Sequence, residues 1–198
     1  MTTRHLDLGC RPCPRNTHQC DEVHAVDWVI PDRLDPLRFR YANPSLEPIP
    51  HADSSFDSIS AFDSLGFVPR VLNTADERGT RSAFLDLMSE IHRMLVPAGR
   101  FYALTPAYPS VEAFQDPTHV NVITEGTRRY FCGDVPMVRP YGFTGAFEMR
   151  RNERAMYPEA FEPLEAARWR RLYGPRRFIA KDNYSPLMWQ FACVKPVA

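Results

Sequence analysis

Seven prolines fall within the first fifty residues, at positions 12, 14, 31, 36, 44, 48 and 50. Proline fixes φ and lacks a backbone N–H, so a long α-helix cannot run through such a segment. The first quarter of the chain must therefore consist of short elements joined by stiff connections. The whole chain has 198 residues, which suffices for one domain with a substantial core and is short for two.

Short apolar runs bounded by turn-forming residues predict five buried strands, over 3–8, 23–27, 38–42, 54–62 and 100–106. The clearest helix is predicted over 80–96, where apolar residues recur every three or four positions before Pro97-Ala-Gly99. Strands that alternate with helices or stiff crossovers form a parallel sheet. The predicted fold class is α/β, with a Rossmann-like, doubly wound, mostly parallel sheet in a three-layer sandwich.

The pattern of apolar residues that indicates secondary structure is weaker beyond residue 107. It predicts helices over about 124–131 and 160–173 and strands over 143–150 and 187–195. The last two strands are expected to pair antiparallel at one edge of the sheet.

Composition narrows the class of protein. Lys+Arg and Asp+Glu both total 24, so no basic excess favours a nucleic acid as partner. The opening MTTRHLDL is unlike a signal peptide, and no run approaches the roughly 18 apolar residues of a membrane span. We expect a soluble, cytoplasmic protein that does not bind membranes. Its five cysteines, an odd number, are expected to be free thiols.

The stretch HLDLGC resembles a strand that feeds a ligand-binding turn. In an open α/β sheet, ligands bind beyond the carboxyl ends of the strands. Gly9 allows a close turn there, and Asp27, which ends the next predicted strand, is suited to accept hydrogen bonds from a ribose diol. An ordinary strand-to-turn transition would explain these two residues equally well.

Further segments make the pattern specific. HLDLGC, VHAVD, LEPIPHADSSFDSISAFDSL and FLDLMSEIHRMLVPAGRFYALTP occur in the order and at the intervals of the motifs of class I methyltransferases that use S-adenosylmethionine (SAM). The resemblance spans roughly residues 4–131, and it is greatest for a bacterial and phage subgroup that carries FQDPTHVNVIT, here at 114–124. It implies one domain, with a cofactor-binding part over about 1–106 and an acceptor side with the C-terminal sheet edge over about 107–198.

The same resemblance implies the cofactor-binding residues. Asp7, Gly9 and the Cys10-Arg11 backbone would face the methionine part of SAM, and Asp27 the ribose. The remaining residues would bind the adenine or line the pocket floor: Asn43 or Ser45, and then Ala61, Phe62 and Asp63 up to Ser64.

Two positions depart from the family pattern. Arg11 stands where relatives have a second glycine, and it would either pair with the carboxylate of the cofactor or block the site. Gly66-Phe67 replaces a frequent Glu-His pair. These departures support an alternative, a catalytically inactive methyltransferase-like binding or scaffold protein. A nicotinamide-binding protein would require G-x-G-x-x-G, which GCRPCP does not provide.

The segment FQDPTHVN supplies candidates for catalysis. A hydroxyl acceptor must lose its proton during methyl transfer, and His119 is the one histidine of this segment, the residue type that most often acts as a general base at neutral pH. We predict His119 as general base, with Asp116 either orienting it or binding the acceptor, and Asn121, Thr118 and Tyr108 as acceptor contacts. In the structural alternative, Asp116 caps a turn over Thr118 and His119 packs against the cofactor.

Two rival interpretations concern other segments. Cys10, Cys13, His18 and Cys20, with His24 nearby, have the chemistry of zinc ligands, although Pro12 and Pro14 restrict the loop. We therefore predict no metal. The basic run over 150–182, with Trp169, Tyr173 and Phe178, is either a groove for an anionic acceptor or a solvated helix face.

Together these observations predict a SAM-dependent methyltransferase, and specifically an O-methyltransferase that acts on a small molecule or on a sugar hydroxyl of a glycan. The identity of the acceptor rests on the resemblance alone. A homodimer is left open.

Overall fold

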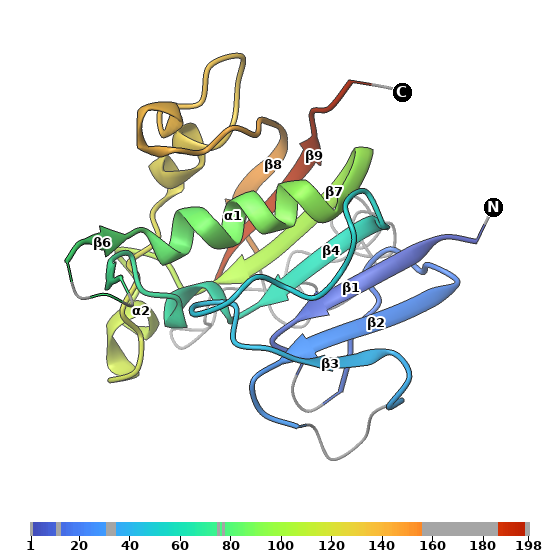
Figure 1. Cartoon of the computed structure of the whole chain (residues 1–198). Helices are drawn as coiled ribbons and strands as arrows, with labels where there is room; N and C mark the ends of the chain where they lie inside the picture. Colours follow the sequence, from blue (N-terminus) through green and yellow to red (C-terminus); the bar gives the residue numbers. More distant parts are fainter. Residues whose placement is uncertain are drawn as a thin grey trace, which may run out of the picture.

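The computed structural model describes residues 2–10, 13–30, 35–74, 76, 78–155 and 186–196. Within these ranges seven strands form one sheet, in the order β3-β2-β1-β4-β7-β9-β8 (Figure 1). The strands are β1 (Arg4–Leu8), β2 (Glu22–Asp27), β3 (Phe39–Tyr41), β4 (Phe56–Phe62), β7 (Leu95–Thr105), β8 (Phe147–Arg154) and β9 (Leu187–Cys193). Neighbours from β3 to β7 are parallel, whereas β9 runs antiparallel to both β7 and β8. The predicted fold class, a mostly parallel Rossmann-like sheet with an antiparallel edge, is confirmed.

The remaining elements lie outside this sheet. They are the paired strands β5 (Leu72–Asn73) and β6 (Thr80–Arg81), the helices α1 (Ala83–Met94) and α2 (Glu112–Gln115), and the 3-10 turns η1 (Leu65–Phe67), η2 (Glu125–Tyr130) and η3 (Arg139–Tyr141). None of the helices in the described ranges has the length and apolar character needed to cross a membrane.

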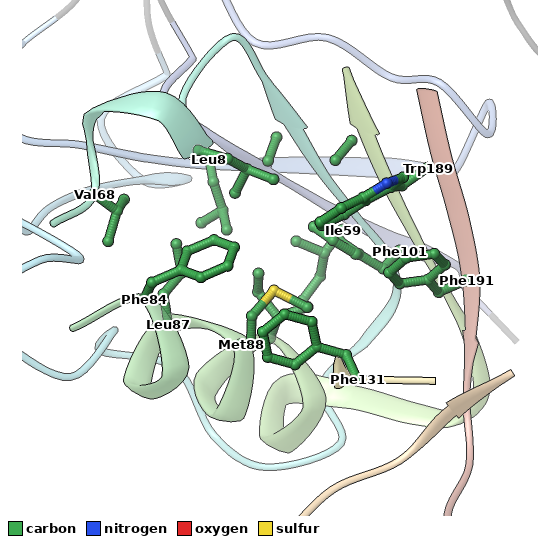
Figure 2. Close-up of a cluster of buried hydrophobic side chains, with 14 of the residues drawn as sticks. Leu8, Ile59, Val68, Phe84, Leu87, Met88, Phe101, Phe131, Trp189 and Phe191 are labelled. Atoms are coloured by element: carbon green, nitrogen blue, oxygen red, sulfur yellow. The ribbon is translucent and has the colours of Figure 1, made fainter. Parts of the chain in front are cut away.

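Helix α1 crosses one face of the sheet, and its contact with the strands forms the main core (Figure 1). Its apolar residues repeat every three or four positions, so one stripe of the helix is buried. Figure 2 shows Phe84, Leu87 and Met88 pointing from α1 toward the sheet. Their partners are apolar side chains of four neighbouring strands, among them Leu8, Ile59, Phe101, Trp189 and Phe191.

The predicted helix over 80–96 is too long at both ends. Thr80 and Arg81 pair with β5 instead, which moves the start of the helix to Ala83. At the other end, the N–H groups of Ser54 and Ser55 donate to the carbonyls of Arg93 and Met94. A segment distant in the sequence thus satisfies the last carbonyls and ends the helix, a signal that no local pattern contains.

The predicted strand over 143–150 begins too early. Phe143 is buried against Phe131, with ring centroids 5.5 Å apart, and lies outside the ladder. Strand β8 starts at Phe147, opposite Cys193, and continues through polar residues to Arg154, because β9 supplies pairing partners on both sides of a register shift between Met149 and Arg151. The antiparallel pairing of these two strands is confirmed.

Neither of the two helices predicted beyond residue 107 is seen as an α-helix in the described residues. The helix expected over 124–131 is the 3-10 turn η2, which Thr124 and Thr127 close with a capping box. The helix expected over 160–173 lies outside the described residues, as do Trp169, Tyr173 and Phe178.

The two faces of the sheet differ in chemistry because successive side chains of a strand point to opposite sides. In β1, Leu6 and Leu8 face α1, whereas His5 and Asp7 face the other side together with Ser58 and Ser60 of β4. The connection between β1 and β2 covers these polar groups, and its described parts, residues 9–10 and 13–21, are not helical. In the described ranges α1 is the one helical layer, and the second layer of the sandwich stays a prediction.

Because Met88 of α1 is fully buried, we expect Met88→Ala to lower the free energy of unfolding by about 2–5 kcal/mol. Chemical denaturation measures this loss. The neighbouring Ser89→Ala is the matched control and should cost less than about 1 kcal/mol, because Ser89 is half-buried and its hydroxyl bonds only the carbonyl of Leu85. Equal losses for the two variants would contradict the assigned core face.

Candidate functional site: a pocket at the carboxyl ends of β1, β2 and β4

A pocket of about 480 Å³ opens where β1, β2 and β4 end. Strand order places it: the chain passes from β1 outward to β2 and β3, and then crosses to β4 on the other side of β1. Such a reversal leaves a crevice between strand ends, which is the usual ligand site of open α/β sheets. A volume of this size falls in the range of small-molecule sites.

The lining comes from five segments of the chain. Its residues are Leu8, Gly9, Arg15, Val26, Asp27, Trp28, Asn43, Pro44, Ser45, Leu46, Ala61, Phe62, Asp63, Ser64, Phe67, Val68, Pro69, Leu72 and Leu87. Seven of the ten predicted cofactor-binding residues are among them: Gly9, Asp27, Asn43, Ser45, Ala61, Phe62 and Asp63. The structure thus brings together residues that are up to 54 positions apart in the sequence.

Gly9 makes the turn at the end of β1. Its φ is +72°, a conformation that residues with a side chain rarely adopt, and its N–H donates to the carbonyl of Val26 at 3.0 Å. A Cβ at this position would lie 2.8 Å from the Cβ of Ser64. Both the backbone conformation and the space therefore require glycine at position 9.

Asp27 ends β2 at the wall of the pocket and is 1% exposed. Its Oδ1 accepts the N–H of Val29 at 3.0 Å, which bends the chain away after the strand. A carboxylate has about four acceptor positions, so it can take further hydrogen bonds from a hydroxyl pair. Beside it Trp28 lines the pocket and is 51% exposed, which leaves an aromatic surface for a planar group.

Asn43 and Ser45 line the pocket from the turn after β3, the strand that pairs with β2. The Oδ1 of Asn43 accepts the N–H of Ser45 at 3.0 Å, and the N–H of Asn43 donates to Glu47 at 2.9 Å. These contacts hold a tight turn around Pro44, so that the turn presents Leu46 to the pocket together with its polar groups.

Asp7 and Cys10 do not line the pocket, and both are buried. Asp7 instead stabilises the residues around the pocket through hydrogen bonds. Its Oδ1 accepts the hydroxyl of Ser60 at 2.6 Å, and its Oδ2 accepts the backbone N–H of Arg15 at 2.9 Å. Asp7 thereby fastens the connection after β1 to the sheet. Arg11, the predicted partner of the cofactor carboxylate, lies outside the described residues.

The hydrogen bonds of Asp7 continue through a buried polar chain. His5 lies between two serines, with Nε2 2.9 Å from Ser60 Oγ and Nδ1 2.7 Å from Ser58 Oγ. Burial lowers the pKa of His5 to about 3, so the imidazole is neutral. Since Ser60 donates to Asp7, Nε2 must carry the proton and Nδ1 must accept from Ser58. Cys20 Sγ lies 3.4 Å from Ser58 Oγ and completes the chain as a donor.

The segment over 116–121 packs against η1 next to the pocket. The N–H groups of Val120 and Asn121 donate to the carbonyl of Gly66 at 2.9 and 3.0 Å. The His119 ring lies 4.7 Å from the ring of Phe67, a pocket residue, although His119 itself is not part of the lining.

The other predicted acceptor-side residues have different partners. Asp116 Oδ1 accepts both the N–H and the hydroxyl of Thr118, at 2.8 and 2.6 Å. Asn121 Oδ1 accepts a hydrogen bond from Arg70 at 2.8 Å. Tyr108 is 55% exposed and lies near Phe114. None of these four predicted residues lines the pocket.

The zinc interpretation lacks a ligand cluster in the described ranges, where no three His, Cys, Asp or Glu side chains gather in a way that could hold a metal ion. None of the five cysteines forms a disulfide. Cys20 contacts Ser58, and the His18 ring lies 6.4 Å from that of His5. His24 contacts His51 and Phe56 instead, with ring centroids 5.9 and 5.4 Å apart.

Sequence reasoning missed several lining residues. Trp28, Leu46, Leu72 and Leu87 have no distinguishing pattern, because an apolar residue of a turn or helix looks the same whether it faces a core or a pocket. Arg15 was also missed. The one signal available for it is its position in the connection that follows Gly9.

Comparison with solved structures shows the same fold in methyltransferases. A putative methyltransferase from Haloferax volcanii, solved in complex with the methyltransferase activator Trm112, matches with a TM-score of 0.54 and 13% identity over 98% of this chain and 84% of its own. A putative sarcosine dimethylglycine methyltransferase from Galdieria sulphuraria matches with a TM-score of 0.52 and 13% identity, over 99% and 79% of the two chains.

A third structure, the [4+2]-cyclase SpnF, matches with a TM-score of 0.51 and 16% identity over 100% of this chain and 76% of its own. No protein-family model and no curated protein matches the sequence. At such low identities the likeness concerns the fold. A cyclase beside methyltransferases also illustrates that the fold alone does not determine the reaction.

Asp7 should make stability depend on pH. Burial raises its pKa from 3.8 to about 6, so the folded state retains a proton that the unfolded state has lost between these values. Stability therefore falls as pH rises from about 4 to 6. We expect the free energy of unfolding of the wild type, relative to Asp7→Asn, to fall by roughly 2 kcal/mol from pH 4 to pH 7 in urea titrations.

Asp116→Asn is the matched control for this experiment. The hydrogen bonds from Thr118 lower the pKa of Asp116, which is half-buried. The wild type should therefore gain slightly in stability relative to this variant as pH rises, which is the opposite sign. Parallel pH profiles for the wild type and Asp7→Asn would rule out the raised pKa.

Proposed function

We propose that this chain is a SAM-dependent methyltransferase that acts on a small molecule or on a sugar hydroxyl of a glycan. The observation that carries the proposal is the pocket of about 480 Å³ at the switch point of the sheet, with the Gly9 turn on one side and the Asp27 carboxylate on the other. An adenosyl ligand requires such a combination of a closely approaching backbone, a diol acceptor and apolar walls.

The residues present fit this cofactor. Asp27 would accept the ribose hydroxyls, and Trp28 and Leu46 would flank the adenine near the turn of Asn43 and Ser45. The turn at Gly9 and the strand end at Phe62 and Asp63 would hold the part of SAM beyond the ribose and the adenine. SAM supplies a methyl group on a sulfonium, and the main task of the protein is to align this group with the acceptor.

The acceptor side is proposed to lie next to Phe67, where the 116–121 segment meets the pocket. His119 is the proposed general base for a hydroxyl acceptor, because its imidazole contacts the ring of Phe67, which lines the pocket. Asp116 is proposed to orient His119 or to bind the acceptor, while its carboxylate also holds the turn through Thr118. Thr118, Asn121 and Tyr108 are proposed to contact the acceptor. The proposal of O-methylation therefore depends on the role of His119, whereas the proposal of a SAM site is independent of it.

The broader expectations belong to the same proposal. A single domain would contain the cofactor part up to about residue 106 and the acceptor part beyond it. A cytoplasmic location and a bacterial origin stay predictions, and a homodimer stays open. The alternative of an inactive scaffold makes a distinct prediction, since it requires no affinity for SAM.

Calorimetric titration with S-adenosylhomocysteine tests the cofactor site. The wild type should bind, and Asp27→Ala should weaken binding at least about fivefold, because two hydroxyls lose a charged acceptor. The matched control is Asp57→Ala, which removes a half-buried carboxylate at the start of β4, away from the pocket, where it accepts the N–H of Arg4. No binding by the wild type at millimolar ligand would favour the scaffold alternative.

A pair of His119 variants separates catalysis from packing. His119→Phe keeps a ring against Phe67 and removes the proton acceptor, and His119→Ala removes both. We expect both variants to lower turnover about 100-fold or more, with little change in S-adenosylhomocysteine affinity. S-adenosylhomocysteine release, measured over a panel of free sugars, nucleotide-sugars and small amines, reports turnover. Full activity of His119→Phe would leave His119 with a packing role.

A further inference from the structure

Arg15 reaches the pocket from the connection between β1 and β2. Its guanidinium carbon lies 4.4 Å from the centroid of the Phe62 ring, at the carboxyl end of β4. Among the described lining residues it is the one cationic side chain, and the charged residues beside it, Asp27 and Asp63, are acidic. The pocket thus has a positive group at one position, and the rest of its described wall is acidic, neutral polar or apolar.

Arg15 is held in place through both its backbone and its side chain. Its backbone N–H donates to Asp7 Oδ2 at 2.9 Å, and its guanidinium stacks on Phe62. Asp7 is fully buried and is itself held by the hydroxyl of Ser60. A guanidinium that is anchored in this way loses little conformational freedom when it binds an anion, which strengthens binding.

The strand order separates the two charged ends of the pocket. Asp27 ends β2 and Phe62 ends β4, with β1 between them. Two strand spacings amount to about 10 Å. A ligand with hydroxyls at Asp27 and an anionic group at Arg15 would therefore lie across the end of β1, directly over the Gly9 turn.

We propose that Arg15 binds the carboxylate of the aminocarboxypropyl arm of SAM. This proposal rests on the proposed function and assigns to Arg15 the contact that the sequence suggested for Arg11. A planar guanidinium forms paired, charge-assisted hydrogen bonds with a carboxylate. The same chemistry would also suit a phosphate of an acceptor, and the experiment distinguishes the two sources.

The test compares two ligands on one variant. S-adenosylhomocysteine and 5′-methylthioadenosine share the adenosine and the thioether, but the second lacks the aminocarboxypropyl arm. Arg15→Met keeps an unbranched side chain over Phe62 and removes the charge. By calorimetry we expect the variant to bind S-adenosylhomocysteine about 10- to 100-fold more weakly than the wild type. Its affinity for 5′-methylthioadenosine should change by less than about twofold.

Arg129→Met is the matched control, since Arg129 is exposed in η2 outside the pocket and its replacement removes the same charge. It should bind both ligands as the wild type does, and thermal unfolding checks that Arg15→Met is folded.

An equal loss for both ligands would show that Arg15 merely shapes the pocket and would overturn the assignment. Unchanged S-adenosylhomocysteine binding with weakened binding of a nucleotide-sugar would overturn it in favour of an acceptor phosphate. If the wild type binds neither adenosyl ligand, the proposed function itself fails.

Discussion

The arrangement of the site depends on two hydrogen bonds that the buried Asp7 carboxylate accepts. One of its oxygens accepts the hydroxyl of Ser60 from β4, and the other accepts the backbone N–H of Arg15 from the connection after β1. A buried carboxylate without such partners would be strongly destabilising. The connection therefore has one position in which Asp7 is satisfied, and that position places the Arg15 side chain at the pocket and the turn at Gly9 beside Ser64.

The two faces of the sheet have separate tasks. The face toward α1 is apolar and provides the core, in which Ile59, Phe101 and Trp189 are fully buried. The opposite face contains the chain of hydrogen bonds from Cys20 through Ser58, His5 and Ser60 to Asp7. Hydrogen bonds are directional, whereas apolar contacts are not, so the polar face is the one that can orient a connection. The pocket opens at the strand ends, where the two faces meet.

Several features of the site could be predicted because they follow from strand ends. Gly9 and Asp27 each come directly after a recognisable apolar run, and parallel strands bring such ends to one edge of the sheet. Ala61 and Phe62 follow from the same reasoning for β4. The role of Asp7 as a support could not be predicted, because it depends on Ser60 and Arg15, and nothing local in the sequence marks these residues as its partners.

The sequence by itself determined the strands, the amphipathic helix and the mostly parallel order, because hydrophobic periodicity and prolines are local properties of the chain. Tertiary structure decided where α1 ends, since Ser54 and Ser55 supply the donors for its last carbonyls. It also decided which side chains reach the pocket, because Arg15 is brought there through Asp7 while Tyr108 stays exposed. Long-range hydrogen bonds and pocket walls join residues far apart in the chain, and no local pattern encodes such pairs.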